Sequence, residues 1–266
     1  MSFLDHLEEL RWHLIRSLAS IAVFAIAAFI GSKYIWHSVI LAPSRADFWT
    51  YRMMCKIGDL TGSEFLCIEE LPFIIQSRQM TGQFTMAILS SVVIGLICAF
   101  PYTFWELWRF IKPGLHITEK KASRGAVFFV AVLFALGTLF GYYVISPISI
   151  RFLSTYQVDP SIANEFDIIS YVTIVCTLVL VCALMFQLPI VVYFLTKAGL
   201  INPSIMRTYR KHALVVILVL SAILTPPDVI SQILVSLPLL ILYQISIYIS
   251  ASVLKKENRL AKASES

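Results

Sequence analysis

Long apolar runs separated by short polar segments dominate the chain. They cover residues 18–35, 80–104, 126–148, 168–196, 213–224 and 229–253. A helix that crosses a bilayer needs roughly 20 apolar residues, so the pattern predicts an all-α, polytopic membrane protein with six transmembrane helices. The fifth run is short, since about 1.5 Å per residue gives it roughly 20 Å, against a hydrocarbon core about 30 Å thick. We therefore expect the last two spans to be short or tightly turned.

Composition and charge support this prediction and orient the chain. It is 58% hydrophobic and only 14% charged, whereas soluble domains are about 25% charged. The mean hydropathy of +0.81 indicates that the bilayer is the solvent for most of residues 1–266, which we treat as one transmembrane domain. Six spans place both termini on one side. Lysines and arginines concentrate in the segments of that side, which predicts cytoplasmic N- and C-termini.

The first 17 residues differ in character from the run that follows. They read MSFLDHLEELRWHLIRS, which mixes acids and bases and lacks the basic-then-apolar order of a signal peptide. Leu4, Leu7, Leu10 and Leu14 fall at helical spacing. We expect residues 1–17 to form a cytoplasmic amphipathic helix that lies along the membrane surface before turning into the first span. Residues 254–266 are expected to form a cytoplasmic tail.

The longest predicted outer segment, residues 43–77, mixes acidic and aromatic residues in the manner of a small folded cap. It would face the periplasm. Cys55 and Cys67 both lie in it. An oxidising compartment would allow them to form a disulfide, but their spacing alone does not decide between a pair and two free thiols.

Three polar residues stand out between or within the apolar runs. Glu119 lies among bases in RFIKPGLHITEKK, residues 109–121, which we expect to be an inner loop. Two roles are open to it: a solvated partner for the neighbouring lysines, or a carboxylate that meets a positive charge from another molecule. Gln187 lies inside the fourth run, where a hydrogen bond to a neighbouring helix is expected. Asp228 follows TPP and is expected to cap the last helix.

The chain lacks the usual signatures of catalysis. It contains no GxxxxGK, HExxH or GxSxG motif. The five histidines are all expected at or near span ends, and charges within the predicted spans are nearly absent. We therefore expect no enzyme activity, no metal or other cofactor, and no nucleic-acid partner. A small-solute transporter or channel is the alternative class, although such proteins often show internal repeats with matching broken helices, and no convincing repeat is present.

Several motifs occur together and in order. They are FLDHLEELRWHLI near the N-terminus, AP at Ala42 and Pro43, the loop RFIKPGLHITEKK, FQLPIV, and TPPDVISQ before the last run. In this combination the chain resembles the TatC family, the multispanning receptor subunit of the twin-arginine protein translocase. The resemblance implies a location in the cell inner membrane and transport driven by the proton-motive force. It also implies single-span TatA and TatB partners and a homo-oligomer within the complex.

The resemblance also assigns roles to individual residues. In the family, the N-terminal region and the first inner loop bind signal peptides that carry consecutive arginines. A carboxylate can grip the planar fork of an arginine with two hydrogen bonds, and Phe110 would add an apolar contact. Pro43 and Asp228 mark structural turns, and Gln187 replaces a family acid, so it could contact a partner helix but carry no charge. The positions matched to signal-peptide binding are Glu8, Glu9, Arg11, Phe110, Pro113 and Glu119.

Overall fold

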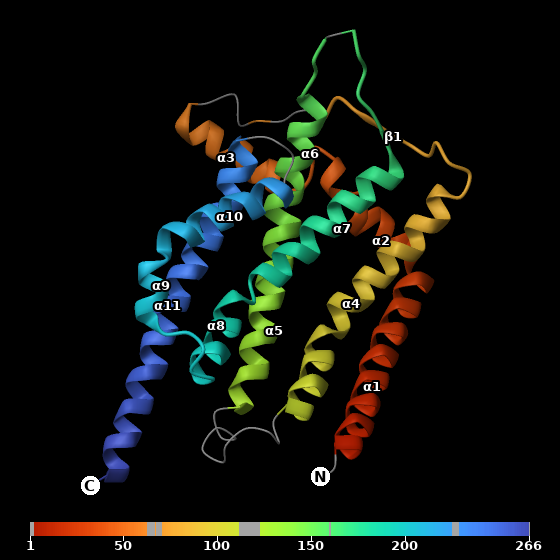
Figure 1. The fold of residues 1–266 in the computed structure, drawn as a ribbon. Coiled ribbons are helices and arrows are strands. Elements are labelled where there is room, and N and C mark those ends of the chain that lie inside the picture. The colour runs from red at the N-terminus through yellow and green to blue at the C-terminus, as the bar shows by residue number, and fades with distance from the viewer. Residues whose placement is uncertain are drawn as a thin grey trace.

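The computed structural model describes residues 3–62, 67, 71–111, 123–159, 161–224 and 229–265. Long helices form an array in which both chain termini lie at the same end (Figure 1). We call this the terminal end, and the opposite end, with short helices and strands, the cap end. The longer helices are α1 (Phe3–Ile30), α4 (Gly82–Ile111), α5 (Ser123–Phe140), α6 (Ser146–Thr155), α7 (Ile168–Met185), α8 (Leu188–Lys197), α10 (Arg210–Leu224) and α11 (Val229–Glu265).

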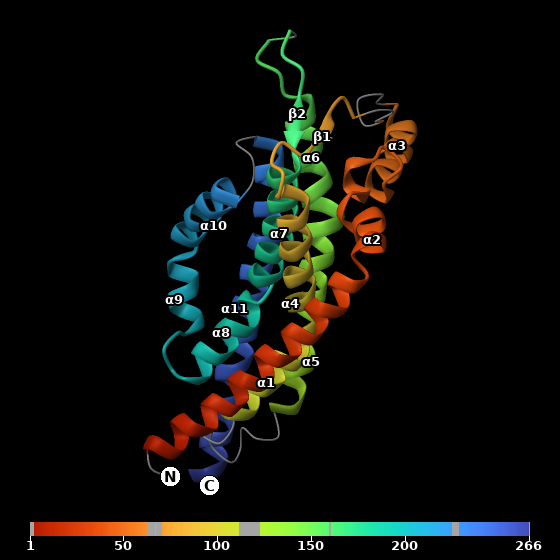
Figure 2. The same ribbon diagram turned by 90° about the vertical axis from the view of Figure 1, so that its right-hand side faces the viewer.

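Helix length and apolar character make this a multi-pass membrane protein. Among the described residues, five stretches are long and apolar enough to cross a bilayer: Glu8–Ile30, Gly82–Phe110, Val127–Thr155, Ile168–Lys197 and Val235–Lys255. Large apolar side chains on their outer surfaces are exposed, which suits contact with lipid. The predicted short fifth run is α10, with 15 residues. With the short α9 (Pro203–Thr208), α10 lies on one flank of the array (Figure 2).

The helix boundaries correct two expectations and give the helical form of the expected C-terminal tail. The expected turn between a surface helix and the first span is absent, because α1 is continuous from Phe3 to Ile30. Neither glycine nor proline interrupts it before Gly31. Helix α4 continues to Ile111, so Phe110 lies on its last turn and not in a loop. The expected C-terminal tail is the continuation of α11, which reaches Glu265.

The closest helix contact pairs α1 with α4. A Cβ atom added at Gly95 of α4 would lie 2.6 Å from the backbone nitrogen of Ala25 on α1. Real Cβ atoms do not approach backbone so closely, so only glycine permits this crossing. Small residues let helix backbones approach closely within membranes, where packing is a main source of association. The α1–α4 pair is therefore fixed near the middle of α4 and in the last third of α1.

The cap end is built from short elements. Helix α2 (Ser32–Ile35) and the π-helical turn η1 (Trp36–Ile40) lead to η2 (Ala42–Ser44), where Pro43 is buried, and then to α3 (Trp49–Thr61). The structure joins Cys55 on α3 to Cys67 by a disulfide. A small parallel sheet pairs β1 (Ile74–Gln76) with β2 (Glu165–Asp167). These strands were not predicted, because three residues are too few to show an alternating pattern.

Tyrosine hydroxyls hold the cap together by hydrogen bonds to backbone carbonyls. Tyr51 is 1% exposed, and its hydroxyl lies 3.0 Å from the Pro43 oxygen and 2.8 Å from the Pro147 oxygen. Tyr142 donates to the Val39 carbonyl at 2.8 Å. Tyr171 donates to the Ile40 carbonyl at 2.9 Å. Burial raises the pKa of Tyr51, so its hydroxyl keeps the proton that it shares between the two carbonyls.

We expect Tyr51→Phe to lower the free energy of unfolding by about 1–3 kcal/mol, because it leaves two buried carbonyls without their donor. The thermal midpoint in detergent, followed by size-exclusion chromatography after heating, measures this loss. Tyr34→Phe is the matched control, since Tyr34 is 76% exposed. Equal midpoints for the two variants would show that the Tyr51 hydroxyl does not stabilise the cap.

We expect Gly95→Val to force α1 away from α4 and to lower the yield of folded protein sharply, because the new side chain would overlap Ala25. Gly125→Val controls for the helix propensity of valine. Gly125 lies on the exposed surface of α5, and a Cβ there meets only Phe129 at ordinary distance. Equal yields of monodisperse protein from both variants would contradict the close crossing.

Candidate functional site

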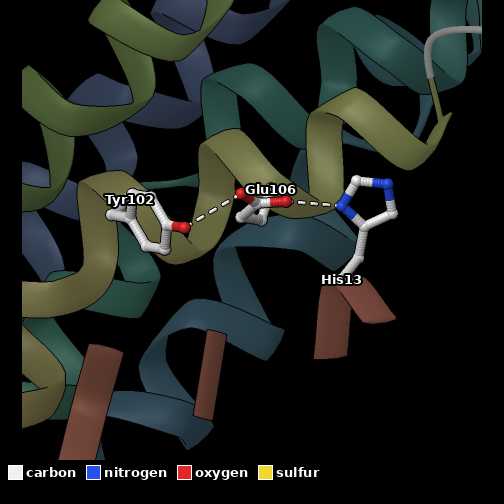
Figure 3. A network of polar contacts seen from close by, with 3 residues as sticks. All are labelled: His13, Tyr102 and Glu106. Carbon is white, nitrogen blue, oxygen red and sulfur yellow. Dashed lines mark hydrogen bonds and ion pairs between the residues drawn. The ribbon is translucent and has the colours of Figure 1, made fainter. Parts of the chain in front are cut away.

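A buried polar cluster joins α1 to α4 near the terminal end (Figure 3). His13 of α1 lies with its Nδ1 2.5 Å from Oε2 of Glu106 on α4. The Tyr102 hydroxyl, one turn earlier on α4, donates to Oε1 of the same carboxylate at 3.0 Å. The side chains of His13 and Glu106 are only 6% and 2% exposed. Each oxygen of the buried carboxylate thus has its own partner.

This pairing offsets a large desolvation cost. A buried carboxylate is unfavourable unless its oxygens accept hydrogen bonds, and a buried charge needs a partner. With Glu106 ionised, the Nδ1–H of His13 supplies that partner from a different helix. The contact stabilises the register of α1 against α4 as well as their separation. Since the Gly95 crossing lies about three turns away on the same pair, the two contacts together fix the geometry of the terminal end.

The register places two of the predicted binding residues opposite one another. Helices α1 and α4 run antiparallel (Figure 1). Glu9 lies one turn before His13 on α1, and Phe110 lies one turn after Glu106 on α4. Both positions are therefore one turn beyond the His13–Glu106 contact, toward the terminal end. The rings of His13 and Phe110 lie 6.2 Å apart, in agreement with this placement.

The first turns of α1 present carboxylates to solvent. Glu8 is exposed and Glu9 is half-buried. Within the described residues neither side chain makes an ion pair or hydrogen bond. Arg11 is exposed, and its guanidinium lies 5.7 Å from the centre of the Trp12 ring. The site thus combines two carboxylates that are available to a cation with the aromatic side chain of Phe110.

The other predicted site residues are not gathered here. Glu119, Pro113 and Asp228 lie outside the described residues. Pro43 and the Cys55–Cys67 disulfide belong to the cap end.

Gln187 lies at the junction of α7 and α8, in the bend of the fourth span. Its Nε2 is 3.4 Å from the Val130 oxygen of α5 and 3.5 Å from the Ala183 oxygen of α7. Its Oε1 is buried and has no donor among the described residues. The expected hydrogen bond to a neighbouring helix is therefore present within this chain, at long distances. The amide oxygen of Gln187 has no hydrogen-bond partner among the described residues.

Sequence reasoning missed His13 and Glu106. It ended the second span at residue 104, so Glu106 fell outside the predicted span, and it expected every histidine at or near a span end. Because α4 continues past Glu106, the carboxylate is buried in the helix pair. One signal was available: Glu106 follows Tyr102 by four residues inside the aromatic-rich segment YTFWELW, on one helical face. Within the described part of the chain, no three side chains of His, Cys, Asp or Glu form a group that could hold a metal ion.

Comparison with known proteins identifies the family. The family model described as TatC, Sec-independent protein translocase protein, matches residues 5–238. This chain belongs to the TatC family. A TatC protein from Blattabacterium of Periplaneta americana is 40% identical over 261 residues, covering 97% of each chain. One from Helicobacter pylori is 36% identical over 248 residues, covering 93% of this chain and 87% of its own.

Solved TatC structures share the fold. The crystal structure titled as the twin-arginine translocase receptor TatC in DDM is 30% identical and covers 92% of this chain and 99% of its own, with a TM-score of 0.71. A second crystal structure of the receptor gives a TM-score of 0.67, with 93% of this chain covered. The predicted all-α, multi-pass fold and TatC membership are thus confirmed. TatC is a family of translocase proteins and not an enzyme family.

We expect His13→Leu and Glu106→Leu each to destabilise the protein by about 3 kcal/mol or more, because each leaves a buried polar partner unpaired. The double variant His13→Leu/Glu106→Leu should be more stable than either single one, since neither buried member of the pair is then left without the other. The Tyr102 hydroxyl loses its acceptor in both Glu106 variants, but this residue is 39% exposed and can bond to water. Thermal midpoints in detergent provide the double-mutant cycle. Strictly additive losses would show that the two side chains do not stabilise one another.

Proposed function

We propose that this TatC-family protein is the receptor and core subunit of a twin-arginine translocase. In this proposal it binds the twin-arginine signal peptides of folded precursors at the cytoplasmic face. The terminal end would face the cytoplasm of a cell whose inner membrane holds the protein. The observation that carries the proposal is the α1–α4 junction, where the Phe110 ring lies 6.2 Å from that of His13. Glu9 lies one turn before His13, and both Glu8 and Glu9 lack a partner within the described residues.

The chemistry of the junction suits paired guanidinium groups. An arginine presents N–H donors in a planar fork that matches the two oxygens of a carboxylate, whereas a lysine offers a single point charge. Two adjacent arginines need two carboxylates, and Glu9 with Glu119 would supply them. Glu8 is the other candidate from α1. The hydrophobic part of the signal would then contact Phe110 and the apolar faces of α1 and α4.

Partner subunits would complete the translocase. We infer that single-span TatA and TatB helices pack against the lipid-facing helices, in a complex with further copies of this chain that the proton-motive force drives. Gln187 is the polar residue of the spans that we propose for a contact with a partner helix. Since glutamine does not ionise, this contact would be independent of pH.

We expect Glu9→Gln to weaken binding of a twin-arginine peptide about tenfold or more, and Glu119→Ala to do the same, because each removes one charge-assisted hydrogen-bonded pair. Fluorescence anisotropy of a labelled signal peptide, titrated with the full-length protein in detergent, measures the affinity. Asp59→Asn, at an exposed position of α3 on the cap end, is the charge-matched control.

A twin-lysine version of the same peptide distinguishes a receptor from the alternative of a small-solute transporter. The receptor should prefer the twin-arginine peptide, and only the Glu9 and Glu119 variants should lose this preference. Equal binding of both peptides by every variant would overturn the assignment of these carboxylates. Absence of peptide binding, with solute uptake into proteoliposomes, would favour the transporter.

A further inference from the structure

A second site lies at the cap end, away from the α1–α4 junction. An open cavity of about 740 Å³ lies among the segment after α1, strand β1, the first turns of α4 and the start of α7. These elements adjoin at the upper right of Figure 1. Pockets that bind small molecules typically have about 300–1,000 Å³. The cavity is therefore large enough for a substantial part of an amphipathic molecule.

The cavity has a polar, cationic part and an apolar part. Lys33 and Arg45 supply two positive charges, and none of the described residues that line the cavity is acidic. Three acids lie near lining residues along the chain without lining the cavity: Asp47, Glu165 and Asp167. The Glu165 carboxylate lies 3.7 Å from Arg78. The remaining polar lining residues are Ser32, Ser44 and Gln83, and the apolar ones are Leu41, Phe73, Ile74, Ile75, Ala87 and Ile168.

One cationic side chain of the lining is held in place. Arg45 is oriented by His37, since its Nη2 lies 2.9 Å from Nδ1 of that ring and donates to the His37 carbonyl at 3.0 Å. A guanidinium has five N–H donors, so others are left for a ligand. An anion in the cavity would accept hydrogen bonds from these remaining donors.

The position of the cavity matches a membrane boundary. Lys33 follows the end of α1 at Ile30, while Gln83 and Ala87 occupy the first turns of α4, and Ile168 begins α7. All three helices enter the bilayer here, so the charged part lies at headgroup level beside apolar side chains that continue toward the hydrocarbon core. Only a ligand with an anionic head and hydrocarbon chains matches both parts.

We propose that this cavity binds an anionic glycerophospholipid. The phosphodiester accepts hydrogen bonds from Arg45 and Lys33, because arginine and phosphate pair in two-pronged geometry. The acyl chains lie along Phe73, Ile75 and Ala87. The bound lipid ties the start of α4 to the segment after α1, which makes it a structural ligand of the cap end.

Native mass spectrometry of the full-length protein in detergent tests the proposal, with dioleoylphosphatidylglycerol and dioleoylphosphatidylcholine as probes. We expect tight binding of one phosphatidylglycerol and at least tenfold weaker binding of phosphatidylcholine. Lys33→Gln/Arg45→Gln should weaken phosphatidylglycerol binding about tenfold or more. The matched control is Arg52→Gln/Lys56→Gln, which removes two exposed bases from α3 at the same end but outside the cavity.

Three results would overturn the proposal. The first is an equal loss in both double variants, which would indicate only general attraction between lipid and basic residues. The second is unchanged phosphatidylglycerol binding in Lys33→Gln/Arg45→Gln. The third is displacement of the lipid by millimolar inorganic phosphate, since a site that needs the acyl chains should not release its ligand to the headgroup ion alone. Twin-arginine peptide binding by the same variants stays normal if the receptor function is correct, so the two proposals fail separately.

Discussion

The contact between His13 and Glu106 is the interaction on which the terminal end of this TatC-family protein depends. A carboxylate in the interior of a membrane helix pair is tolerated only with partners for both oxygens, and here they come from Tyr102 and from the opposite helix. The close approach at Gly95 brings the helices together, and the buried pair fixes how they are aligned. Because Glu9 and Phe110 lie one turn further on, their separation follows from this alignment.

The terminal end and the cap end of the molecule differ in the interactions that their side chains make. At the terminal end, the carboxylates of Glu8 and Glu9 have no ion-pair or hydrogen-bond partner among the described residues, which suits reversible binding of a cation. At the cap end, a tyrosine hydroxyl and a short parallel sheet connect segments far apart in the sequence, and a disulfide joins two cysteines 12 residues apart. These contacts stabilise the cap end, for whose cavity we propose a lipid.

Much of the architecture was predictable, because bilayer thickness dictates the length of apolar runs. The spans, the short helix α10 and the family followed from hydropathy and motif order. The continuity of α1 was not predicted, since an amphipathic pattern at a span end looks the same whether or not the chain turns. The paired strands were too short to show a period. The role of Glu106 depended on a helix boundary a few residues beyond the apolar run, where hydropathy gives no warning of burial.

The most direct measurement is to map where the arginine pair of a bound signal peptide lies. A peptide with a photoreactive residue next to its two arginines can be crosslinked to the protein in detergent, and the labelled positions identified by peptide mass spectrometry. The account predicts labels on the first turns of α1 and on the last turn of α4, around Glu9 and Phe110, competed by unlabelled twin-arginine peptide. Specific labels confined to the cap end, or to α10 and α11, would contradict it.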